Sequence, residues 1–217
     1  DGMGFWEFTA DTYPEVLGAT AEHVVLVLQG LAAALIVAVP VAALTYRTRL
    51  PRGAALGIAG IVLTIPSYAL FGLLIAPLGL GTAPAVVALT LYALLPIMRN
   101  TVVGLRSVDP SVVEAGRGMG LSRGQILRTI ELPLAWPVII TGLRVATQIL
   151  LGIAAIAAAV NGPGLGNLIL EGLSSAGTPF AVYLTLQGTL GIVVLAVLFD
   201  LCFAVLARFT TSRGIRV

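Results

Sequence analysis

The residue types that catalytic and cofactor sites most often need are scarce in this chain of 217 residues. All twelve basic residues are arginines, and Cys202 and His23 are the single cysteine and the single histidine. Without lysine the chain has neither a GxxxxGK[ST] phosphate-binding loop nor a Schiff-base lysine. One cysteine and one histidine also exclude a disulfide framework and a Cys/His zinc site. We therefore expect a protein that works without an ATPase site of its own.

The pattern that does carry chemical information lies in residues 99–133, the only long polar stretch between apolar runs. Asp109 followed by Pro110 is a strong helix start, because the carboxylate accepts from free backbone N–H groups and proline needs no partner there. Gly118 and Gly120 favour the end of this helix after about two turns. The stretch therefore predicts a short, well-delimited helix.

A second helix start follows directly. Ser122 with Gln125 three residues later forms a capping-box pattern, and Ile126, Leu127 and Ile130 place apolar side chains at helical spacing. Pro133 restricts the residue before it, so we expect this second helix to end there.

Seven residues of this segment have a characteristic spacing: Glu114, Ala115, Gly116, Gly120, Ile130, Leu132 and Pro133. They resemble the EAA loop of ABC importer permeases, E-A-A-x3-G-x9-I-x-L-P, with Gly116 where the family usually has alanine. Glycine costs about 1 kcal/mol relative to alanine within a helix. We therefore expect this helix to depend on being held by a partner.

The resemblance implies that the first of the two helices is a coupling helix, which docks on a separate ATP-hydrolysing subunit. It assigns this coupling to Glu114, Ala115, Gly116, Arg117, Gly120, Ile130, Leu132 and Pro133. Glu114 and Arg117, three residues apart, can pair with each other or with the partner. ATP and Mg would be bound by the ATPase, and this chain would bind no cofactor or metal. The other implied partners are a second permease, alike or different, an extracytoplasmic binding protein and membrane lipid, but no nucleic acid.

The elements that position this loop are membrane spans. The chain is 58% hydrophobic and 10% charged, with a mean hydropathy of +1.04, which excludes an ordinary soluble protein. A span needs about 20 apolar residues. Such runs occupy residues 24–46, 53–76, 78–98, 138–160 and 181–207. We predict a single all-α, polytopic permease domain over residues 1–217, with five transmembrane helices and the type I ABC importer permease fold.

Charge placement predicts the orientation. Residues 1–23 carry five acids and no arginine, and we interpret them as an extracytoplasmic leader in which Met3 is a candidate natural start. Cytoplasmic loops are enriched in arginine. With five spans, three arginine groups share the inner side: Arg47, Arg49 and Arg52; Arg99, Arg106, Arg117, Arg123 and Arg128; and Arg208, Arg213 and Arg216. The prediction is N-outside, C-inside, in the inner membrane of a prokaryotic cell.

Residues 161–179, on the predicted outer side, are rich in glycine around an apolar stretch too short to cross a membrane. They favour a re-entrant scoop packed on the other helices. An outer loop with a short surface helix is the alternative.

The resemblance extends to residues 64–106, 162–166 and 208–214, which are similar to the osmoprotectant branch of the family. That branch imports glycine betaine, proline betaine, carnitine or choline. Permeases for methionine, sulfonates or polar amino acids share the loop and remain an alternative. A passive channel or an intramembrane enzyme is a more remote one.

Aromatic faces bind quaternary ammonium groups, which makes Tyr68, Phe71 and Tyr92 candidates for the translocation path. Asn161 is a fourth candidate, for orienting a substrate carboxylate. Helix packing or an interfacial position is the alternative for the three aromatic residues, and helix capping for Asn161.

Three further polar residues lie within the predicted spans. Asp200 is an intramembrane carboxylate, for which we favour a bond to another helix or to an arginine over a direct functional role. Arg144 can extend toward the membrane surface. Gln148 can line a path or bond between helices, and we favour the second.

Overall fold

The computed structural model describes residues 4–210, which are helical without any strand. The α-helices are α1 (Phe5–Asp11), α2 (Tyr13–Thr45), α3 (Arg49–Thr64), α4 (Ser67–Leu78), α5 (Thr82–Arg106), α6 (Pro110–Gly118), α7 (Arg123–Ile126), α8 (Leu132–Ile156), α9 (Gly166–Ser174) and α10 (Ala181–Thr210). A π-helix at Leu127–Glu131 precedes α8, and a 3-10 helix at Ala157–Val160 follows it. The candidate start at Met3 and the arginines at 213 and 216 lie outside the described residues.

Within residues 4–210, four helical stretches are long and apolar enough to cross a membrane: α2, α5, the stretch Arg123–Val160 and α10. They coincide with the first, third, fourth and fifth predicted spans. The second predicted span is α3 and α4 together, bent by 99°. Ile65 and Pro66 interrupt it in extended conformations, as expected for a residue that precedes proline. Tyr92 of α5 stabilises the break by donating to the Ile65 carbonyl at 2.6 Å.

The expectation that Pro133 ends a helix is wrong. The helix continues from Arg123 through the π-helix into α8. Proline removes one backbone donor and clashes with the carbonyl four residues earlier. The wider π turn just before Pro133 relieves that clash, and the Leu132 N–H reaches back five residues to the Leu127 carbonyl.

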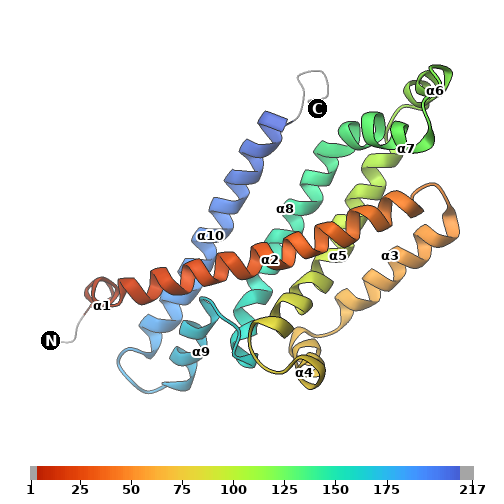
Figure 1. The fold of residues 1–217 in the computed structure, drawn as a ribbon. Coiled ribbons are helices and arrows are strands. Elements are labelled where there is room, and N and C mark those ends of the chain that lie inside the picture. The colour runs from red at the N-terminus through yellow and green to blue at the C-terminus, as the bar shows by residue number, and fades with distance from the viewer. Residues whose placement is uncertain (1–3, 211–217) are drawn as a thin grey trace.

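The core lies between α2, α5 and α8, which pack side by side (Figure 1). Small residues permit this close approach. A Cβ on Gly30 of α2 would lie 2.7 Å from the Leu89 Cβ of α5, and one on Gly142 of α8 would lie 2.7 Å from the Asn100 Cβ of α5. In contrast, α10 buries few of its side chains within the chain.

The two ends of the helix bundle carry different short helices. The α6 and α7 helices lie at the end where α2 finishes and α8 begins, whereas α4 and α9 lie at the opposite end (Figure 1). In α9, Leu168 is buried and Gly172 packs against Thr185 of α10, where a Cβ would approach the hydroxyl to 2.3 Å. The segment 161–179 thus contains a short helix packed on α10, and its depth in the membrane stays a prediction.

Candidate functional site

The α6 helix has the start and the end that its sequence predicts. The Asp109 carboxylate accepts from the Ser111 N–H at 2.8 Å, Pro110 is the first helical residue, and the helix ends at Gly118. This backbone hydrogen bond lowers the pKa of Asp109 below its ordinary value. Gly120 then turns the chain with a φ of +80°, a conformation that favours glycine.

The capping box of α7 is also formed. Ser122 Oγ accepts from the Gln125 N–H at 3.3 Å, and Gln125 Oε1 accepts from the Ser122 N–H at 2.8 Å. Since only a tight turn at Gly120 separates the end of α6 from the start of α7, the two helices form a short, well-defined unit at one end of the bundle.

Gly116 attaches α6 to the helix that leads into α8. It is buried, and a Cβ built on it would lie 2.7 Å from Ile130 Cδ1 and 3.5 Å from Ile126 Cγ1. The first and last parts of the predicted motif are therefore in direct contact. The glycine in place of the family's alanine coincides with a close approach between α6 and the π-helix.

The other motif residues divide between two environments. Glu114, Ala115 and Arg117 are exposed on α6, while Leu132 packs against a small buried apolar cluster that contains Tyr46. Among residues 4–210 no ion pair joins Glu114 to Arg117. Glu114 and Arg117 were expected to pair either with each other or with the partner subunit. The first pairing is absent, and both side chains are exposed where a partner could bind them.

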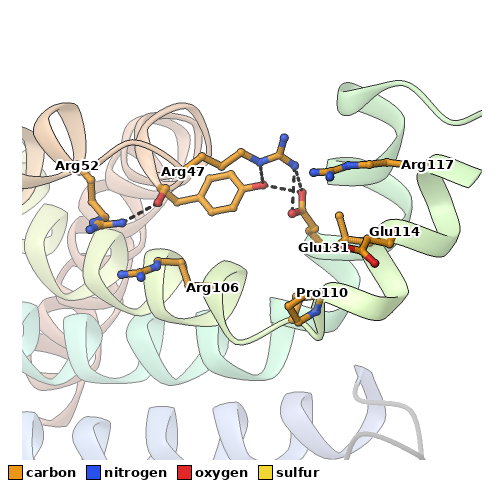
Figure 2. Close-up of a pocket in the computed structure, with 10 residues that line it drawn as sticks. Arg47, Arg52, Arg106, Pro110, Glu114, Arg117 and Glu131 are labelled. Atoms are coloured by element: carbon orange, nitrogen blue, oxygen red, sulfur yellow. Dashed lines mark hydrogen bonds and ion pairs between the residues drawn. The ribbon is translucent and has the colours of Figure 1, made fainter.

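A cleft of about 320 Å³ lies between α6, the end of α5 and the segment that follows α2 (Figure 2). Its charged lining consists of Arg47, Arg52, Arg106, Arg117, Glu114 and Glu131. Arg52 donates to the Tyr46 carbonyl at 2.9 Å, which fixes the turn between α2 and α3. The cleft thus brings together the ends of three helices and the base of α6.

One wall of this cleft is a hydrogen-bonded group of three side chains. Tyr46 Oη donates to Glu131 Oε2 at 2.6 Å, and Arg47 Nη2 donates to the same carboxylate at 2.9 and 3.1 Å. Burial, together with the hydrogen bond to Glu131, raises the pKa of Tyr46 to about 12, so the phenol remains a donor at neutral pH. Glu131 is 4% exposed, and this pairing compensates the cost of burying it.

Sequence reasoning missed Tyr46, Arg47 and Glu131 as site residues. Glu131 occupies the unspecified position between Ile130 and Leu132 of the motif. A signal was present, because it is the only acid between Glu114 and Glu171 in a region rich in arginine. Its partners, 84 and 85 residues earlier, could not be identified from spacing.

The four candidate path residues are not brought together in one open site. Phe71 is 1% exposed and Tyr92 is 2% exposed, and both belong to the main core. Tyr68, just after the Pro66 break, is 64% exposed. Asn161 is exposed and ends the 3-10 helix in a left-handed conformation, with a φ of 57°. Of the three aromatic candidates, only Tyr68 presents an accessible ring in this conformation.

The polar residues of the spans bond between helices. Asp200 of α10 forms an ion pair with Arg144 of α8, which confirms a bond to another helix and identifies its partner. Gln148 donates to the Ala196 carbonyl of α10 at 3.0 Å, as the favoured interpretation expected.

The fold and this helical loop are those of a binding-protein-dependent transport permease. Residues 30–212 match the family described as "Binding-protein-dependent transport system inner membrane component". The chain belongs to this family and is a multi-pass inner-membrane protein of the ABC transporter permease type.

Relatives align along nearly the whole chain. The osmoprotectant import permease protein OsmW of Salmonella typhimurium is 42% identical over 203 residues, covering 91% of this chain and 92% of the relative. The glycine betaine/carnitine/choline transport system permease protein OpuCB of Bacillus subtilis is 36% identical over 202 residues, covering 93% and 91%. The choline transport system permease protein OpuBB of the same organism is 37% identical, with the same coverage.

A solved structure supports the fold. The permease of the MetNI methionine ABC transporter, in an inward-facing conformation, superposes with a TM-score of 0.81 at 22% identity. The match covers 93% of this chain and 99% of the other. At this identity the likeness concerns the fold alone.

Proposed function

We propose that this chain is the permease subunit of an ATP-driven importer for osmoprotectants that carry a quaternary ammonium group, such as glycine betaine, choline and carnitine. The observation that carries the proposal is the alignment, over at least nine-tenths of the chain, with permeases named for these solutes. The likeness to a methionine transporter is weaker in sequence and concerns the fold, so a methionine, sulfonate or amino-acid importer is less supported.

The proposed coupling element is α6. It is a short helix with both ends fixed, its exposed face carries Glu114 and Arg117, and its buried face contacts the helix that continues into α8. A rigid connection of this kind can pass a displacement of the ATPase to the membrane helices. ATP and Mg belong to that partner subunit, with which two permease chains and an extracytoplasmic binding protein complete the transporter.

We further propose five spans with the N-terminus outside. The ends of α2 and α5 line the same cleft, so α3 and α4 must together return the chain to the opposite end of the bundle. At that opposite end the Gly81 N–H, just before α5, donates to the Val160 carbonyl after α8 at 2.7 Å. These contacts support counting the bent pair as one crossing, and the arginines favour the α6 end as cytoplasmic.

The proposal is tested by uptake into vesicles that contain the permease with its ATPase and binding protein. We expect ATP-dependent uptake of radiolabelled glycine betaine, choline or carnitine in preference to methionine and taurine. A preference for methionine or the sulfonate would refute the substrate class, and uptake without ATP would indicate a passive channel. As a variant test of coupling, Glu114→Arg should release the ATPase in a pull-down.

A further inference from the structure

The exposed face of α8 carries polar and charged residues, although α8 lies within a membrane-spanning stretch. Between positions 141 and 152 the exposed residues are Thr141, Arg144, Val145, Gln148 and Gly152. The buried residues of the same stretch are apolar apart from Thr147 and Gly142: Leu143, Ala146, Leu150 and Leu151. A helix that faces lipid would instead expose apolar side chains on its outer side.

The other spans show what a lipid-facing surface looks like in this chain. Exposed side chains of α2 include Leu28, Ile36 and Val37, and those of α3 include Ile58 and Ile61. These residues suit contact with acyl chains. The stripe of Thr141, Arg144, Gln148 and Gly152, called the α8 stripe below, does not.

Arg144 of the stripe forms an ion pair that adds to this contrast with the lipid-facing surfaces. Arg144 and Asp200 bond to each other, yet their side chains remain 45% and 40% exposed. Arg144 lies six residues inside the predicted span 138–160, and Asp200 lies seven residues before the end of the predicted span 181–207. Both are about 9 to 10 Å from these span ends at 1.5 Å per residue. Charges at such a depth face a bundle interior or a water-filled cavity, because exposure to hydrocarbon is costly.

We infer that the α8 stripe lines the water-filled translocation path, with the Arg144–Asp200 pair at its wall. The stripe extends over twelve residues, about 16 Å along the helix. Gly152 leaves its part of the surface open, since a Cβ there would meet nothing within 4 Å. This assignment rests on the proposed transport function and places the path on α8, away from the buried Phe71 and Tyr92.

The path also suits the proposed solutes. Glycine betaine and carnitine carry a carboxylate and an ammonium group, and Arg144 and Asp200 offer the two complementary charges at one position. Gln148 donates to the Ala196 carbonyl and thereby holds α10 next to α8 one turn further along. The stripe therefore combines a hydrated surface with a fixed pair of opposite charges.

The test is thiol accessibility in vesicles that contain the assembled transporter. Cys202 is the chain's only cysteine, so Cys202→Ala provides a background without thiols. Into it we place Thr141→Cys, Gln148→Cys or Gly152→Cys on the stripe. The controls are Leu150→Cys, which is buried, and Val37→Cys, which is exposed on the apolar face of α2. The probe is methanethiosulfonate ethyltrimethylammonium, which is membrane-impermeant and carries a quaternary ammonium group.

Because these reagents react with thiolates in water, we expect the stripe cysteines to react at least about tenfold faster than either control. Excess choline or glycine betaine should slow the reaction. Reaction of both Gln148→Cys and Gly152→Cys as slowly as Val37→Cys would overturn the inference, whether lipid or a second permease covers the stripe. Gly152→Cys keeps the test valid if Gln148→Cys misfolds, because its side chain enters open space.

Uptake by the same vesicles separates the two proposals. Slow labelling of the stripe with intact choline uptake would refute the path alone. Fast labelling of the stripe together with uptake of methionine in place of choline would refute the substrate class. The assignment of the α8 stripe to the translocation path would then still hold.

Discussion

Gly116 of α6 packs against Ile130 of the π-helix, so closely that a Cβ on the glycine would lie 2.7 Å from Ile130 Cδ1. These two residues belong to the first and last parts of the EAA motif. Their contact holds α6 against the helix that continues into α8, so the two parts of the motif fix the proposed coupling helix to a membrane span.

Enlarging residue 116 should therefore uncouple the permease. Gly116→Leu should displace α6 and reduce retention of the ATPase severely, because leucine cannot fit beneath Ile130. Gly116→Ala should retain most of it, since the flexible end of Ile130 can move. Gly57→Leu, on an open face of α3 where a Cβ meets nothing within 4 Å, is the control for added bulk. A pull-down with the ATPase measures retention, and full retention by Gly116→Leu would contradict the assignment of α6.

The contact between Tyr46 and Glu131 leads to a second prediction. Tyr46→Phe removes a donor to a buried carboxylate and should lower the free energy of unfolding by about 1 to 2 kcal/mol. Thermal unfolding of the purified permease measures this change. Tyr13→Phe, at a tyrosine that is 59% exposed, is the matched control and should have little effect.

The pH dependence of this effect has a definite sign. The pKa of Tyr46 is raised to about 12 from an ordinary value of 10.0, so the folded state holds the proton more tightly. The resulting stabilisation is complete below pH 10 and is lost as the pH rises through about 12. The stability difference between wild type and Tyr46→Phe should therefore shrink from pH 8 to about pH 11.5. An equal difference at both values would contradict the link between this stabilisation and the titration of the Tyr46 phenol.

The parts of the site that sequence predicts well are local. Asp109 with Pro110 and Ser122 with Gln125 set the starts of α6 and α7 through hydrogen bonds that span two or three residues. Such cap chemistry needs no knowledge of the tertiary fold.

The remaining features depend on contacts between distant segments. Glu131 is paired with Tyr46 across 85 residues, and a side chain's partner at that distance is set by helix packing. The continuation of the helix through Pro133 required a π turn, which proline alone does not signal. Likewise, aromatic composition favoured Phe71 and Tyr92 as path residues, whereas packing against α5 and the Pro66 break buries them.

The proposed topology predicts which surface positions meet the outside. In the Cys202→Ala background, Asp11→Cys and Ala176→Cys should react with an impermeant maleimide in intact cells, and Met119→Cys only after permeabilisation. All three positions are exposed, so access and not burial decides the result. Labelling of Met119→Cys in intact cells would reverse the orientation. Finding Asp11→Cys protected and Ala176→Cys labelled would show that the N-terminal segment lies inside.

Tyr68 remains a candidate contact for the ammonium group, because its ring is accessible beside the Pro66 break. A cation–π contact contributes about 0.5 to 2 kcal/mol, depending on desolvation. Since about 1.4 kcal/mol corresponds to one decade in rate, Tyr68→Ala should slow betaine or choline uptake by about two- to thirtyfold. Tyr68→Phe should be nearly silent because the aromatic face is retained.

Uptake of radiolabelled choline in vesicles, normalised to the amount of permease in the membrane, measures the effect of Tyr68→Ala. Tyr13→Ala removes another exposed tyrosine and controls for the loss of an interfacial ring. An unchanged rate for Tyr68→Ala would exclude the residue from substrate contact and leave the α8 stripe as the path surface. Equal losses of uptake rate in Tyr68→Ala and Tyr13→Ala would assign both rings to anchoring at the membrane interface. A substrate contact at Tyr68 would instead make the loss specific to that residue.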